Sequence, residues 1–264
     1  MWKLIAFVVL LAVMLAVQAP AWLVTDRIAA AAGGWIDLRN ANGTVWRGSA
    51  DAYAPVSSGA VGTGGNSVAA ANPGIAGAAI ALGHLGWRIA GIDWPRRALI
   101  VEIEQTPGAA RPVTLVAGID RRMMSGAIRL PAAIAMRVRQ LAGWPLGGTI
   151  TFESDQFAFN GGADGNVSFA WQDASVTPVD LPEAIPLGDV TGRIAADAKG
   201  FSVSFSNSGG NVAVSGSGDS RTGQVSLQAE PRATATPSQS AWLQSHLPAT
   251  APGRYAIGFT LPRN

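Results

Sequence analysis

The chain divides into one apolar segment near its N-terminus and a long remainder in which glycines punctuate alternating apolar and polar residues. Between Leu4 and Val24 the only polar side chain is Gln18. As an α-helix this segment would be about 31 Å long, which matches the hydrocarbon core of a bilayer. We therefore expect a transmembrane anchor at residues 4–24, a cytoplasmic tail at residues 1–3 and an exported domain at residues 25–264.

A cleaved signal peptide is the alternative for the N-terminal segment. Lys3 supplies a minimal positive region, and Ala19-Pro20-Ala21 offers the small residues that a signal peptidase prefers. However, the apolar run continues to Val24, beyond the usual length of a signal-peptide core, and Trp2 and Trp22 stand where interfacial tryptophans belong. These features favour a retained single-pass anchor in the inner membrane, with the bulk of the chain in the periplasm.

The composition indicates a folded, strand-rich domain. Hydrophobic residues make up 48% of the chain and charged residues 14%, a balance that excludes disorder, and the 32 glycines exclude a coiled coil. The chain has no cysteine, so disulfides and thiolate metal sites are excluded. Its arginines are scattered rather than clustered, and we therefore expect no nucleic-acid partner.

A short strand pattern recurs along the exported domain: a glycine, then apolar residues at alternate positions. An alternation of period two places the apolar side chains on one face of a strand, as half-solvated antiparallel strands require. We expect a mainly β protein, with a large curled antiparallel sheet that forms an open barrel or a sandwich. The pattern begins at Gly126, Gly148, Gly165, Gly200, Gly223 and Gly253.

Two short helices are expected to cover the open ends of this sheet. The first would begin at Pro131, bury Ile134, Val138 and Leu141, and end near Gly143. The second would be capped by Thr236, carry Pro237 in its first turn and stop before Pro248. A flexible Gly/Ala-rich loop is expected at about residues 57–78.

No pattern of catalytic, cofactor-binding or metal-ligating residues is present. The two histidines, His84 and His246, are far apart in sequence, so no zinc motif is available. Gly216-Ser217-Gly218 is not a nucleophile elbow, and the glycines at Gly62-Thr63-Gly64-Gly65 lack the ending of a phosphate loop. We therefore expect no catalytic residue, no cofactor and no metal. The charged pairs are expected at strand ends or on polar strand faces: Arg96-Arg97, Arg121-Arg122, and Glu102 with Glu104.

Two tryptophan-containing segments follow the expected anchor. They are Gly43-Thr44-Val45-Trp46-Arg47-Gly48-Ser49-Ala50 and Leu82-Gly83-His84-Leu85-Gly86-Trp87-Arg88-Ile89. Their order, together with later segments at Leu130-Pro131, Gly148-Thr149-Ile150 and Gly188, resembles the type II secretion system protein N family over nearly the whole chain. We expect the first segment to begin the first strand, and Trp46 and Trp87 to pack against each other across the sheet.

The resemblance implies a non-enzymatic subunit of the secretion machinery, anchored in the inner membrane, that assists the export of folded proteins across the outer membrane. Its partners would be other secretion components, in the inner-membrane platform or the outer-membrane secretin.

Two alternatives remain open. One is an anchored lipid-transfer or envelope-assembly protein, similar to the AsmA-like or lipopolysaccharide-export proteins, with a lipid in the groove of a curled sheet. The other is an anchored hydrolase. An inner face that is continuously apolar and uncovered would favour lipid transfer. A closed core formed by Phe152, Phe169, Phe201 and Phe205 would exclude it.

Overall fold

The computed structural model describes residues 18–55, 75–76, 79–108, 111–119, 122–137, 144–159, 162–178 and 180–260. Most of the expected anchor, residues 4–17, and most of the expected loop at 57–78 lie outside these ranges. Among the helices that the structure does describe, none has both the length and the apolar character needed to cross a bilayer.

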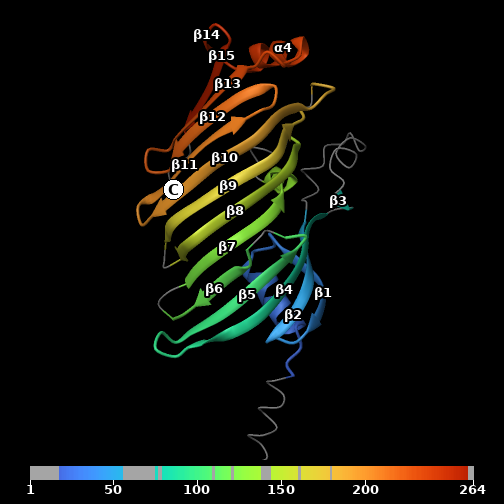
Figure 1. The fold of residues 1–264 in the computed structure, drawn as a ribbon, viewed down its shortest axis with the longest axis vertical. Helices are drawn as coiled ribbons and strands as arrows, with labels where there is room; N and C mark the ends of the chain where they lie inside the picture. The colour runs from blue at the N-terminus through green and yellow to red at the C-terminus, as the bar shows by residue number, and fades with distance from the viewer. Residues whose placement is uncertain are drawn as a thin grey trace, which may run out of the picture.

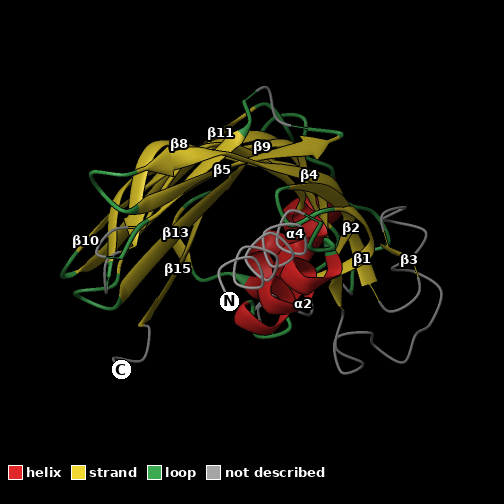
Figure 2. Ribbon diagram, turned by 90° about the horizontal axis from the view of Figure 1, so that it is seen from below, coloured by secondary structure: helices red, strands yellow, loops and turns green. Residues whose placement is uncertain are grey.

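A single antiparallel sheet of fifteen strands dominates the described part of the chain (Figure 1). Strand order follows chain order from β1 to β13, except that the short β3 pairs only with β4; β15 follows β13, and β14 lies outside β15. The sheet is curled into a trough and does not close, and the helices lie on its inner side (Figure 2). The prediction of a mainly β, curled antiparallel sheet is therefore confirmed. The strands are β1 (Asp37–Gly43), β2 (Arg47–Pro55), β3 (Ile75–Ala76), β4 (Ala79–Asp93), β5 (Ala98–Thr106), β6 (Val113–Ala117), β7 (Arg122–Pro131), β8 (Leu146–Phe159), β9 (Ala163–Val176), β10 (Ile185–Asp197), β11 (Gly200–Ser208), β12 (Val212–Asp219), β13 (Gln224–Pro231), β14 (Ala249–Ala251) and β15 (Arg254–Thr260).

Bulges bend the three longest neighbouring strands along one line. The pairing of β8 with β9 shifts at Gly148, and the pairing of β9 with β10 shifts on both sides of Gly188. Gly148, Asp173 and Gly188 all have positive φ, at 92°, 51° and 74°. A residue in this left-handed conformation inserts an extra position and turns the strand. The line of bulges folds the ends of β8, β9 and β10 inward.

Helix α4 (Pro237–His246) packs on these inward-folded ends. Its Trp242 and Leu243 are buried with Ile185 and Leu187 of β10 and with Val212 of β12, in the C-terminal core. The predicted cap is confirmed, because Thr236 accepts a hydrogen bond from the backbone of Gln239, whose side chain bonds back to it. This capping box satisfies backbone groups that the start of a helix leaves free.

A second core lies at the N-terminal end of the sheet. The 3₁₀ helix η1 (Ala132–Arg137) buries Ala133 and Met136 against Ile80 and Leu82 of β4 and the small side chains of β2. Helix α2 (Trp22–Ala31) lies against β1 near this core. The guanidinium of Arg137 donates to the backbone oxygens of Gly34 and Trp35, which ties η1 to the connection between α2 and β1.

Two local expectations were wrong, the start of the first helix and the start of the first strand. Pro131 ends β7, where it pairs with Thr149, and does not begin a helix. The first helix is a short 3₁₀ turn within the described residues, and Val138, Leu141 and Gly143 lie outside them. The first strand after the expected anchor is β1, a polar strand whose last residue is Gly43.

Trp46 is not a cross-strand partner of Trp87. It lies in the turn between β1 and β2, where its side chain is 42% exposed. The register partner of Trp87 on β2 is Gly48. A Cβ on Gly48 would lie 2.5 Å from the Trp87 ring, so the indole occupies the space of the missing side chain.

Candidate functional site on the inner face of the sheet

Two parallel rows of apolar residues cross the inner face of the sheet from strand to strand. The register of the strands makes them continuous, because each member is paired with the next. We call these two rows the apolar trough. The first row consists of Ile128, Phe152, Phe169, Gly192, Phe205, Gly216 and Leu227, and the second of Val167, Ile194, Val203, Gly218 and Val225.

The apolar trough is only half-buried. None of its members is fully buried, although every member is an apolar residue or a glycine. In the adjacent row Val190 and Ala229 are buried instead, because they pack in the C-terminal core with Trp242 and Leu243 of α4. The opposite face of the same strands is polar and exposed, with Thr191 and Arg193 on β10 and Ser215 and Ser217 on β12. The alternation predicted from the sequence is therefore real, but its apolar side is only partly covered.

Aromatic rings of the trough reach over glycines on the neighbouring strands. A Cβ on Gly192 would lie 2.4 Å from the ring of Phe169, and a Cβ on Gly216 would lie 2.4 Å from the ring of Phe205. Each ring therefore occupies the place of the missing side chain on the next strand. Phe152 and Phe169 are also in contact, with their ring centroids 6.1 Å apart. This arrangement gives a smooth apolar floor.

The four phenylalanines singled out in the sequence do not form a closed core. Phe169 and Phe205 pack against the edge of the C-terminal core but remain half-buried, as does Phe152. Phe201 is 47% exposed. The inner face thus meets the condition that was set for a lipid groove, an apolar surface that continues along the sheet without full cover.

His246 belongs to a cluster that sequence reasoning missed. Its Nε2 lies 2.8 Å from a carboxylate oxygen of Asp180, and its Nδ1 lies 2.8 Å from the Ser245 hydroxyl. The imidazole stacks on Trp242 with centroids 4.7 Å apart, and Trp144 meets Trp242 edge-on at 5.4 Å. Asp180 and Trp144 are distant in sequence from His246 and Trp242, so no sequence motif predicts this cluster.

A serine, a histidine and an aspartate in contact invite comparison with a catalytic triad. Here the Ser245 hydroxyl donates to the Trp242 carbonyl at 3.0 Å, and His246 Nδ1 lies 3.0 Å from that same oxygen. Both side chains therefore bond the Trp242 carbonyl in the last turns of α4, where a histidine is also favoured by the helix dipole. This geometry is that of a helix terminus rather than of an activated nucleophile.

His84 lies at the other end of the molecule, on the polar face of β4. Its Nδ1 is 2.9 Å from Asp51 on β2, and Asn40 on β1 donates to the second oxygen of that carboxylate at 2.8 Å. The hydrogen bond from Asn40 and then that from His84 lower the pKa of Asp51 below its usual value. The site links three neighbouring strands near the sheet edge and is exposed to solvent.

The charged pairs lie where the sequence placed them, as far as the structure describes them. Arg96 and Arg97 form the turn between β4 and β5, and Arg96 pairs with Asp93. Glu102 binds Arg88 across β4 and β5, with the Arg88 Nε 2.7 Å from its carboxylate. Arg122 opens β7, and Arg121 is outside the described residues. Among the described residues, no three histidine, aspartate or glutamate side chains converge as metal ligands.

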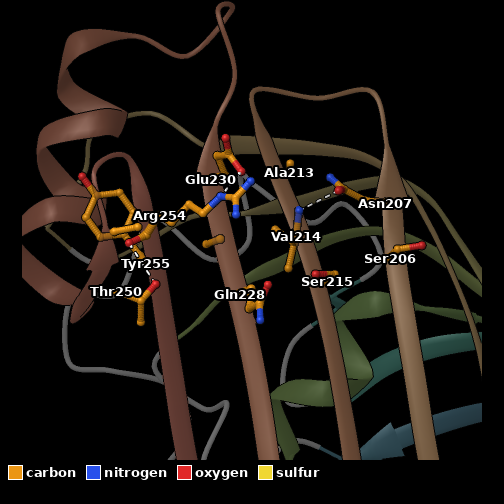
Figure 3. A pocket seen from close by; sticks show the side chains of 12 residues that line it. Ser206, Asn207, Ala213, Val214, Ser215, Gln228, Glu230, Thr250, Arg254 and Tyr255 are labelled. Atoms are coloured by element: carbon orange, nitrogen blue, oxygen red, sulfur yellow. Dashed lines mark hydrogen bonds and ion pairs between the residues drawn. The ribbon is translucent and has the colours of Figure 1, made fainter.

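A shallow polar hollow of about 450 Å³ lies between β11 and β15 (Figure 3). Arg254 reaches across it to Glu230 at 3.2 Å, and Asn207 accepts a hydrogen bond from the backbone of Val214 at 2.7 Å. These contacts link neighbouring strands and leave no converging set of nucleophile and base among the lining residues.

The described residues form one extended open sheet with a partly covered apolar inner face, and they include no cluster of metal-ligating side chains. The family model of type II secretion system (T2SS), protein N, matches residues 35–258, from just before β1 into β15. The chain belongs to this family, and the resemblance drawn from the two tryptophan segments is confirmed. No curated protein and no solved structure matches the chain.

Proposed function

We propose that this chain is a non-enzymatic, single-pass inner-membrane subunit of the type II secretion machinery whose periplasmic sheet assists the export of folded proteins through protein contacts. The observation that carries the proposal is the family match, because it spans almost the entire described sheet. The side chains support it, since the polar clusters of the described residues are explained by strand pairing and helix capping.

The contact with other secretion components is proposed to use a sheet edge. At one edge, β1 carries Asp37, Arg39, Asn40 and Asn42, and polar or charged side chains of this kind discourage strand addition. At the other edge, β14 pairs only with Arg254 and Tyr255, and Ala256 donates to the Pro248 carbonyl. Beyond Ala256, β15 has no charged residue up to Thr260 and offers its backbone to a partner strand.

A crosslinking experiment in intact membranes tests this proposal. A photoreactive amino acid would replace Gly258 on the β15 edge, and Asn40 on the β1 edge in the matched control. We expect position 258 to capture a component of the inner-membrane platform or of the secretin, and position 40 to capture none. Deleting the gene should also leave folded exoproteins in the periplasm. Unchanged secretion together with no captured component would refute the proposal.

The membrane anchor is a separate part of the proposal. Its support is the apolar composition of residues 4–24 and their length. Sodium carbonate extraction of membranes, followed by N-terminal sequencing, should find an intact chain in the membrane fraction. A soluble chain that begins near Trp22 would instead show that the segment is a cleaved signal peptide.

A further inference from the structure

We propose that the apolar trough binds the hydrocarbon chains of membrane phospholipids. This inference goes beyond the role in secretion and concerns a face of the sheet that the proposed edge contact leaves free. It stands on three features of the structure: the trough is long, it carries no charge, and its backbone groups are already paired.

The length of the trough suits an acyl chain. Its first row crosses seven strands, from Ile128 on β7 to Leu227 on β13. Neighbouring strands are about 4.8 Å apart, so the row is about 29 Å long. One acyl chain spans half of a hydrocarbon core, about 15 Å. The trough can therefore hold acyl chains lying across the strands.

Glycines and aromatic rings form the floor of the trough. Gly192 and Gly216 interrupt the row of large side chains, and the rings of Phe169 and Phe205 occupy the space that side chains at these positions would fill. No bulky side chain rises from β10 or β12 in the first row. On one side α4 forms a wall through Trp242 and Leu243, whereas the second row, from Val167 to Val225, stays half-buried.

The chemistry of the trough favours hydrocarbon over peptide. Its strands are hydrogen-bonded to a neighbour on both sides, so a polypeptide lying on the floor would find no backbone partner. Buried peptide groups without partners are costly, whereas an acyl chain has no polar group to satisfy. The absence of charge in the trough also fits an uncharged occupant and places a lipid head group outside it.

The proposed N-terminal anchor indicates which membrane provides the lipid. The apolar segment at residues 4–24 overlaps the start of α2, which lies against β1 on the inner side of the curled sheet (Figure 2). With the proposed anchor in the bilayer, the chain enters α2 and then β1 from the membrane, and the trough begins five strands further along the sheet, at β7. Phospholipid of the inner membrane is thus the nearest supply of hydrocarbon chains.

The test uses the full-length chain in nanodiscs of phosphatidylethanolamine and phosphatidylglycerol. A small fraction of the phosphatidylethanolamine carries a diazirine and an alkyne on one acyl chain, and labelled peptides are identified by mass spectrometry after illumination. We expect labels on peptides that contain Val203 or Leu227, in addition to the N-terminal segment. Labels confined to residues 1–31 would overturn the proposal.

Two neighbouring residues on β13 provide matched variants. Leu227 lies in the trough and Ser226 is exposed on the opposite face of the same strand. Leu227→Asp should reduce labelling of the trough about fivefold or more, since a charge there disfavours hydrocarbon, while Ser226→Asp should leave it unchanged. Equal labelling of both variants would overturn the proposal.

A second measurement does not depend on how well Leu227→Asp folds. A photoreactive amino acid at position 227 of the otherwise unchanged chain should capture phospholipid, and one at position 226 should not. Capture of a protein instead of phospholipid at position 227 would overturn the proposal and show that the trough binds a polypeptide. Secretion of folded proteins and crosslinking at position 258 are measured in parallel, because they test the proposed function separately. If both are normal and no lipid is captured in the trough, only the lipid inference is refuted.

Discussion

A single methyl group added at Gly148 should test how the sheet is bent. Gly148 has a φ of 92°, and a Cβ there would lie 2.4 Å from the Gln172 carbonyl oxygen and 2.6 Å from that of Asp173. The left-handed conformation costs a residue with a side chain about 1–2 kcal/mol. Moving the backbone of β9 adds about 1–3 kcal/mol. We expect Gly148→Ala to lower the free energy of unfolding by about 2–5 kcal/mol.

Gly216→Ala is the matched control for this prediction. Its Cβ would also lie 2.4 Å from a neighbour, the ring of Phe205, which can rotate, and the nearest backbone atom, the Ser226 carbonyl oxygen, would be 3.0 Å away. A strained rotamer of Phe205 would destabilise the folded state by about 0.5–1.5 kcal/mol. Replacing glycine by alanine lowers the entropy of the unfolded chain, which stabilises the folded state by about 0.4–1 kcal/mol. The net change should stay within about 1 kcal/mol.

Thermal unfolding of the full-length chain in nanodiscs, followed by tryptophan fluorescence, compares the two variants. For a domain of this size 1 kcal/mol corresponds to about 2–4 °C in Tm. Gly148→Ala should therefore lower Tm by about 4–20 °C, and Gly216→Ala by less than about 4 °C. Equal shifts for the two variants would refute the argument that backbone contacts at the bulges hold the curvature.

Three further outcomes are expected. Trp242→Ala should cost about 3–5 kcal/mol and expose α4 to hydrogen exchange, whereas protection unchanged in α4 would contradict its role in the C-terminal core. Thr236→Ala should cost about 1 kcal/mol in urea unfolding, and Thr236→Ser should restore most of it, because the hydroxyl is the cap. Hydrogen bonds from the Arg221 side chain and backbone lower the pKa of Asp219 from 3.8 to about 2, so its stabilising contribution is present above pH 4 and is lost as the pH falls toward 2. Carboxyl NMR should show this value, and a pKa near 3.8 in the unchanged chain would contradict the pairing.

Much of the sheet could be predicted from the sequence because a strand with one solvated face leaves a simple pattern. The residues after Gly126, Gly148 and Gly165 alternate, and each run lies in a strand of the structure. The helix at Thr236-Pro237 was equally predictable, because its capping signals are local. By contrast, β1 has polar residues on both faces, since it lies at an edge, and no alternation marked it.

The candidate site was only half predictable. Alternation shows which side of a strand is apolar, but it does not show what covers that side. The burial of Val190 and the partial exposure of Phe205 depend on where α4 lies, which is set by the bulges at Gly148 and Gly188. The cluster of Asp180, Ser245 and His246 was not predictable either, because its contacts depend on how α4 packs against the ends of the long strands.

The coincidence of chain order and spatial order has a consequence for biogenesis. From β4 to β13 each strand adds to the one synthesised just before it. A polypeptide delivered through a translocation channel with its N-terminus first can therefore pair each segment on arrival, with short loops whose closure costs little entropy. Helix α4 is the exception, because its core also contains Tyr255 of β15, which is synthesised after the helix. We expect maturation to end with the docking of this helix.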